Sequence, residues 1–260
     1  ALQKMLTDMK ICQFKSALIH NYHFAGCELQ SKNNNTTGYQ NIGIGFRSLY
    51  STTTGYQNVA IGDESLYSNT NGASNTANGY QSLYGNTTGM QSTAHGYQSL
   101  YSSTTGAQNT AVGFQSLLNN TTGNFNTAFG FVSLAEKITG DNNTAFGYNS
   151  GRTITSGSGN TFVGDGAGYN AAQLIAPVNS MALGSGSYTT ANNQVVIGNT
   201  SITSTILRGT VSASNANITS ITASLFGTSS YAVTASYALS YSGTSGSSGS
   251  SGTSGSNGTS

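Results

Sequence analysis

The chain has 260 residues, of which only 6% are charged, and its formal net charge is +1. Soluble domains usually have about 25% charged residues, so the composition excludes both a basic surface for nucleic acid and an acidic surface for cationic partners. Tyrosine and phenylalanine are frequent and regularly placed, which argues against disorder and predicts β structure. No apolar run reaches the roughly 18 residues of a membrane span, so we expect no membrane insertion.

The N-terminal segment, residues 1–37, lacks the repeat that follows it. Apolar residues at helical spacing predict either a short amphipathic helix that joins three chains or a cap on the repeats. Two cysteines are too few for a disulfide framework. Cysteine and histidine are zinc-ligand types, but their spacing here fits no familiar zinc pattern. They remain a weak metal candidate, and we expect no metal: Cys12, His20, His23 and Cys27.

Residues 38–173 are built on a spacing of 17 residues. Two series of glycines keep this step through eight repeats. One such unit is too short for a helix-pair repeat, which needs roughly 34 residues. The first series is Gly38, Gly55, Gly72, Gly89, Gly106, Gly123, Gly140 and Gly157, and the second is Gly45, Gly62, Gly79, Gly96, Gly113, Gly130, Gly147 and Gly164.

Each repeat places the same kind of side chain at the same position. In order, the columns are an asparagine, a β-branched residue, an alanine, an apolar residue, the second glycine, an aromatic residue, and a Ser-Leu pair that a tyrosine follows in four repeats. One repeat shows all of them except the tyrosine: Asn109, Thr110, Ala111, Val112, Gly113, Phe114, Ser116 and Leu117.

This pattern predicts an all-β fold, a parallel β-roll or β-solenoid of eight 17-residue coils. Glycine accepts the tight corners, and coils stacked about 4.8 Å apart would form a segment of roughly 40 Å. Stacking places like residues over like, so the asparagines form a ladder and the leucines a core stripe. Because one such coil encloses little volume, we expect several chains to share the core, most economically in a homotrimer.

The strands "NVAIG" at 58–62 and "NTAVG" at 109–113 resemble the β-roll heads of trimeric autotransporter adhesins, although the adhesin unit is usually shorter. The longer "NTAxGYQSL…NTTG" unit is more similar to repeats of bacteriophage tail fibres and related virion proteins. The resemblance covers about 38–198. It implies a trimeric, fibrous, surface-exposed protein that attaches to cells, and it transfers no binding residue.

The repeat loosens after Gly164. Residues 174–200 contain "MALGSGS" and "NNQVVIGN", which predict further strands of the roll after a longer excursion. Residues 201–241 form a neck rich in serine, threonine and alanine, for which a coiled coil and an intertwined β structure stay open. Residues 242–260 carry glycine at every third position, which favours a collagen-like triple helix over a flexible linker.

The chain offers few groups for catalysis. Asp63 and Glu64 are neighbours, and adjacent strand residues point to opposite faces, so we interpret them as a solvated pair. "GDGAG" at 164–168 lacks the spacing of a phosphate-binding loop and is interpreted as a turn. We therefore expect no catalytic residue, no cofactor and no enzymatic activity.

Two sets of residues are candidates for binding. Asn78 and His95 interrupt the apolar column, and if that column faces inward they form an interior layer that holds water or an ion between chains. The simpler interpretation is that they are tolerated at an outward position or pair with each other between rungs. Tyrosines on four successive repeats are a candidate surface for glycan stacking or, more simply, a structural ladder: Tyr50, Tyr67, Tyr84 and Tyr101.

The sequence thus predicts a non-enzymatic fibrous protein, a trimeric phage tail fibre that is located on the virion and attaches it to the host cell surface. Its expected partners are its own copies, other tail proteins, and a glycan or protein receptor on the host. The alternatives are a trimeric autotransporter-type adhesin on a bacterial surface and an extracellular structural filament without a receptor.

Overall fold

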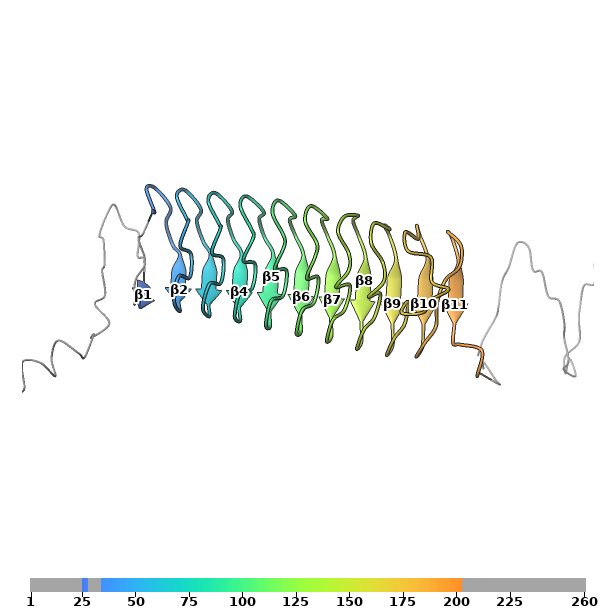
Figure 1. Cartoon of the computed structure of the whole chain (residues 1–260). Coiled ribbons are helices and arrows are strands. Elements are labelled where there is room, and N and C mark those ends of the chain that lie inside the picture. Colours follow the sequence, from blue (N-terminus) through green and yellow to red (C-terminus); the bar gives the residue numbers. More distant parts are fainter. Residues whose placement is uncertain (1–24, 28–33, 203–260) are drawn as a thin grey trace, which may run out of the picture. The chain divides into compact units, whose positions relative to one another are not determined.

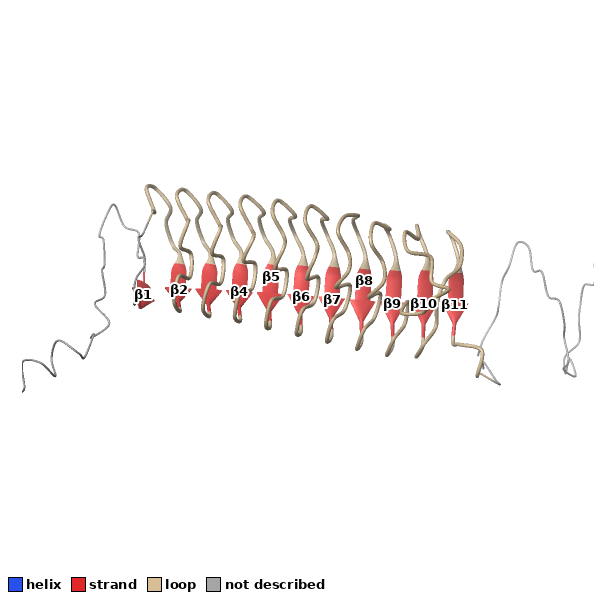
Figure 2. Ribbon diagram, viewed as in Figure 1, coloured by secondary structure: helices blue, strands red, loops and turns tan. Residues whose placement is uncertain are grey.

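The computed structural model describes residues 25–27 and 34–202. They belong to the first of two units, residues 1–205 and 206–260. In the described ranges the secondary structure consists of short β-strands without a helix, and the strands form one parallel sheet in chain order (Figures 1 and 2). The strands are β1 Ala25–Cys27, β2 Ile42–Ile44, β3 Val59–Ile61, β4 Thr76–Asn78, β5 Thr93–His95, β6 Thr110–Val112, β7 Thr127–Phe129, β8 Thr144–Phe146, β9 Thr161–Val163, β10 Met181–Leu183 and β11 Val195–Ile197.

This arrangement confirms the parallel β-solenoid. Each coil contributes one three-residue strand, and the strand of the next coil lies beside it, so that Ala60 pairs with Ala77 and Ala77 with Ala94. Outside the strands, backbone amides also donate to carbonyls of neighbouring coils, as Leu66 N does to Ser82 O at 3.0 Å. The backbone groups of the turns are therefore satisfied along the stack, as buried groups require.

The spacing changes only at the C-terminal end of the sheet. From β1 to β9 equivalent residues are 17 apart. The following steps are 20 residues, between Asn160 and Ser180, and 14 residues, between Val178 and Asn192. The strands expected in "MALGSGS" and "NNQVVIGN" are thus confirmed as β10 and β11.

The sheet also begins earlier than the glycine series. Strand β1 pairs with β2 in the 17-residue register, with Gly26 opposite Gly43. The glycine series misses this strand because Asn21 and Glu28 stand where its two glycines would be.

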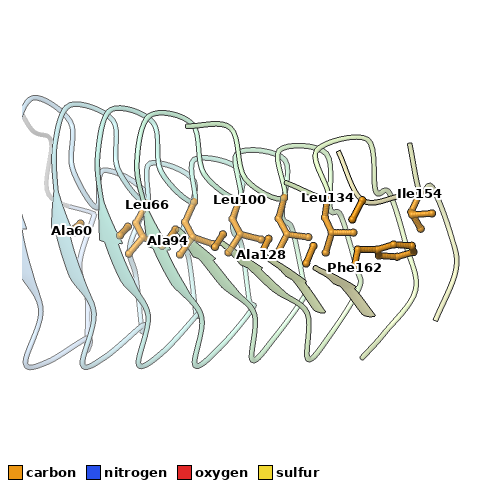
Figure 3. Packing of buried hydrophobic residues seen from close by; sticks show 14 of the residues in the cluster. Ala60, Leu66, Ala94, Leu100, Ala128, Leu134, Ile154 and Phe162 are labelled. Atoms are coloured by element: carbon orange, nitrogen blue, oxygen red, sulfur yellow. The ribbon is translucent and has the colours of Figure 1, made fainter. Parts of the chain in front are cut away.

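The interior of each coil is closed by its own chain (Figure 3). Alanines from the strands and leucines from the opposite turn form two buried columns that face each other. Since these columns bury each other within one chain, sharing of this core between chains is not needed, and the trimer stays a prediction. The buried members are Ala60, Ala77, Ala94, Ala111, Ala128 and Ala145, and Leu49, Leu66, Leu83, Leu100, Leu117 and Leu134.

One exchange of volume shows how tightly this core is filled. At the last regular coils the leucine column continues with Gly151 and Gly168, while the alanine column carries Phe162 (Figure 3). A Cβ on Gly168 would lie 2.4 Å from the Phe162 ring, and one on Gly151 would lie 3.1 Å from it. The ring therefore occupies the space that leucines fill in the other coils.

A ladder of asparagines runs through the interior, as the repeat predicted. In each regular step the side-chain oxygen accepts from the backbone of the next rung, as Asn41 Oδ1 does from Asn58 N at 3.0 Å. Ser92 replaces one asparagine, and its hydroxyl oxygen accepts from Asn109 N at 3.2 Å. The amide nitrogen donates to a glycine carbonyl, as Asn58 Nδ2 does to Gly72 O at 2.8 Å. Buried amides with satisfied partners fix how each coil sits on the next.

The glycines of the two series are required by close contact. Gly62 has φ +124°, and a Cβ there would lie 2.6 Å from the Gly79 carbonyl oxygen. On Gly72 a Cβ would lie 2.6 Å from the carbonyl oxygen of Gly89. No side chain fits at such distances, which explains why the spacing is visible in the sequence.

Candidate functional site: the outer face of the sheet

The strands turn two columns outward and one inward. The middle residue of each strand from β2 to β10 is buried, and the apolar column at the third position faces out of the coil. The aromatic column follows two residues later. Twelve large apolar side chains of these two columns are 37–55% exposed: Ile44, Ile61, Phe129, Phe146, Val163 and Ile197, and Phe46, Tyr80, Tyr97, Phe114, Phe131 and Tyr148. We call the apolar column and the aromatic column together the apolar face.

Rings on the apolar face stack along the solenoid. Tyr97 and Phe114 have ring centroids 5.1 Å apart and an interplanar angle of 7°, and Phe114 and Phe131 have corresponding values of 5.0 Å and 8°. A further stacked pair, Phe129 and Phe146, lies in the apolar column at 4.9 Å. The aromatic column is thus a continuous stack from Tyr80 to Tyr148, with one ring per coil.

Asn78 and His95 are the polar interruptions of the apolar column, whereas the aromatic column is interrupted by Asp63, Asp165 and Ser185. Asn78 and His95 end β4 and β5 and are paired in the sheet, so they occupy neighbouring rungs. Asn78 is half-buried and His95 is exposed. Because their column faces out of the coil, they form no layer inside a single chain. An enclosed layer of water or ion at these residues would have to lie between chains.

The predicted tyrosine column forms a ladder. Tyr50, Tyr67, Tyr84 and Tyr101 are half-buried, and their rings are parallel, with centroids 5.0–5.1 Å apart. Neighbouring rings therefore cover both faces of the two inner rings, which leaves edges and hydroxyl groups for a ligand. Burial raises the pKa of Tyr84, and Glu64 adds to this effect, so the phenol keeps its proton at neutral pH.

Arg47 connects the tyrosine ladder with the apolar face. Its guanidinium carbon lies 4.8 Å from the Phe46 ring centroid and 5.9 Å from that of Tyr50, within cation–π range. Glutamines of successive coils also bond to each other there, as Gln98 Nε2 does to Gln81 Oε1 at 2.9 Å. The apolar face is thus bordered by amides and phenols.

The carboxylates of this region have structural partners. Asp63 Oδ1 accepts from Phe46 N at 3.0 Å, while Glu64 accepts from Gln81 Nε2 at 2.8 Å and lies 3.6 Å from Arg47. Asp63 and Glu64 therefore hold neighbouring coils together in place of converging on a cleft. In "GDGAG" the Gly166 amide donates to Tyr148 O at 2.8 Å, as expected of a turn between coils.

Lys137 is a buried cation that the sequence analysis missed. It stands where neighbouring coils have Asn69, Asn86 and Asn120. Its Nζ donates to the carbonyls of Thr139 and Gly140, the latter at 2.6 Å. Burial lowers its pKa to about 8, against the opposing effect of Asp141. The repeat could have revealed this buried cation, because the lysine stands at a position where other coils have asparagine.

The cysteine and histidine candidates cannot be assembled into a site. Cys12, His20 and His23 lie outside the described residues, and of Cys27 only the backbone, in β1, is described. Among the described residues no group of three or more histidine, cysteine or carboxylate side chains is placed to hold a metal ion. The same part of the chain has no helix long and apolar enough to cross a membrane.

A comparison of the chain with models of protein families, with curated proteins and with solved structures found no match.

Proposed function

We propose that the chain is a structural segment of a trimeric fibre that attaches to cell surfaces, with a phage tail fibre as the leading case. The observation that carries this proposal is the long apolar face on a solenoid with very few charges. Exposed apolar patches of this extent mark protein–protein interfaces. The chain's chemistry is otherwise that of a scaffold, since its carboxylates serve contacts between coils.

The partner on the apolar face is a further copy of the same chain. Aromatic rungs there are 5.0–5.3 Å apart, and only a surface with the same repeat can match every rung along the sheet. A second copy has that repeat. Twelve side chains at about half exposure offer on the order of 800 Å², which is the area that each partner of a standard interface buries.

Around the apolar face, the solenoid repeats polar groups that suit a cell-surface receptor. The tyrosine ladder presents hydroxyl groups, and glutamines such as Gln98 and Gln115 present amides, one per coil. Such groups form hydrogen bonds with a glycan more readily than they stack on it, because neighbouring rings cover the ring faces. Repetition would add many weak contacts into useful avidity.

Light scattering on the purified chain tests the association. We expect the mass of three copies, and a monomer at micromolar concentration would refute the shared face. Antibodies against residues 38–164 then test the location by electron microscopy of virions and host cells from the source. Label on tail fibres supports the leading case.

The main alternative is a bacterial surface adhesin. The observation that favours it is the sequence Asn58–Gly62, "NVAIG", which contains β3 and resembles the strands of trimeric adhesin heads. Antibody label on cell surfaces with bare virions would select this alternative over the tail fibre.

A further inference from the structure

A periodic face leaves one problem of assembly unsolved. Neighbouring rungs are related by a step of 17 residues and carry similar side chains. If one copy slides by one rung along another, nearly all apolar contacts reform, and only the end rungs lose theirs. With apolar contacts alone, arrangements of two copies that differ by one or more rungs would therefore have similar free energy, as in uniform sheets whose register is weakly specified.

Two polar residues in the apolar column make these registers unequal. From β2 to β11 its residues in the strands are apolar except for Asn78 and His95. These two lie on adjacent rungs, β4 and β5, flanked by Ile61 and Val112. The polar pair therefore occurs once along the face and lies away from its centre.

We propose that Asn78 and His95 set the register and the parallel orientation between copies of the chain. This inference rests on the proposed self-association. In the parallel, in-register arrangement, the amide and imidazole groups of one copy face those of the next and can bond to each other or through water. A slip of one rung places His95 of the first copy against Val112 of the second, and Asn78 of the second copy against Ile61 of the first, while Asn78 of the first copy still faces His95 of the second.

That slip has a cost beyond the loss of one end rung. A buried polar group without a partner is destabilising, and each pair of copies would bury two of them. A single polar residue in an apolar seam specifies register in coiled coils for the same reason, at some cost in stability.

The same two residues also select orientation. In an antiparallel arrangement centred on the Phe114 rung, they would face Phe129 and Phe146, and four polar groups would lose their partners. The carboxylates of the aromatic column, Asp63 and Asp165, cannot mark orientation in this way, because they lie symmetrically about Phe114.

The test is a distance between copies. The spin label is attached to Thr127→Cys, at an exposed position of β7, in a chain whose own cysteines are removed by Cys12→Ser and Cys27→Ser. Pulsed electron resonance then measures the distance between labels on different copies. We expect one narrow distance in this background. With Asn78→Val and His95→Val added, we expect an oligomer of equal mass and equal or higher thermal stability, but several distances that reflect slips of about 5 Å.

Light scattering separates the two levels of failure. Monomers in both backgrounds would refute the proposed association itself. Oligomers with one unchanged narrow distance in the double variant would overturn the register proposal while leaving the association intact. Thr93→Val, which removes a polar outward group of the same strand outside the apolar column, is the matched control and should keep the single distance.

A second variant covers the case in which the double variant does not fold. Asn78→Val with Val112→Asn moves the polar pair by one rung to His95 and residue 112. Mixed with copies that keep Asn78 and His95, it should form hetero-oligomers whose labels are offset by about 5 Å along the axis. Hetero-oligomers without this offset would contradict the proposal.

Discussion

Replacement of Lys137 by asparagine should stabilise the protein at neutral pH. The pKa of this buried lysine falls from 10.5 to about 8 because burial disfavours its charged form. Each unit of pKa corresponds to about 1.4 kcal/mol, so the folded state loses roughly 3 kcal/mol where the unfolded chain is protonated. Asparagine removes this cost. It also supplies a donor to Asn120 Oδ1, which lacks a hydrogen-bond partner, in the same way that Asn86 Nδ2 donates to Asn69 Oδ1.

The pH dependence fixes the sign of this effect. Between pH 8 and 10.5 the unfolded state binds more protons at Lys137 than the folded state does, so the free energy of unfolding rises with pH. The penalty is complete below pH 8 and disappears above 10.5. In the Lys137→Asn variant this rise should be absent, and the gain at pH 7 should be between 1 and about 3 kcal/mol.

Urea denaturation at several pH values measures both quantities. Arg47→Gln is the matched control, because it removes a cation whose side chain is 43% exposed, and exposed ion pairs contribute less than about 1 kcal/mol. If Lys137→Asn has no effect at pH 7, or if the slope between pH 8 and 10.5 persists in it, the argument from burial is refuted.

Three other substitutions test the interior. Phe162→Ala should cost about 3–5 kcal/mol by urea denaturation, because the ring fills the space of absent leucines. Phe125→Ala should cost much less, because that ring is 53% exposed and lies outside the apolar face; equal losses would contradict the assignment. Asn109→Ala should cost about 1–3 kcal/mol, since it removes the 2.7 Å bond to Gly123 O and the acceptor for Asn126 N; an unchanged midpoint would show that the ladder is dispensable. Gln108→Gly should raise the melting temperature slightly, because glutamine at φ 57° is strained by roughly 1 kcal/mol, and a clear decrease would refute this strain.

The sequence predicted the parts of the fold that depend on close contact. A glycine such as Gly62 faces a carbonyl at a distance no side chain allows, and an asparagine such as Asn58 bonds both to the coil before it and to a glycine carbonyl. Such demands recur in every coil and therefore appear as columns. Strand β1 escaped because its coil lacks both glycines, although its backbone pairs in the same register.

The orientation of the apolar column was harder to predict. Large apolar side chains are usually interior, but here the strand places Ala128 inside and Phe129 outside. The thin coil is the reason, since an alanine is all that fits opposite Leu134 or Leu117 in the other layer. Alternation along the strand then forces the larger neighbour outward, so Asn78 and His95 face outward too.

This thin interior is a physical reason for the proposed association between copies of the chain. In a compact domain, added residues improve the ratio of buried to exposed surface. Each coil adds one alanine, one leucine and a few small polar side chains, such as Asn58 and Ser65, to the interior, and it adds one rung of exposed surface at the same time. The ratio therefore stays constant however many coils are added. The proposed association along the apolar face would bury more apolar surface per coil, and because each added coil adds a rung to that face, the proposed interface would strengthen as the solenoid lengthens.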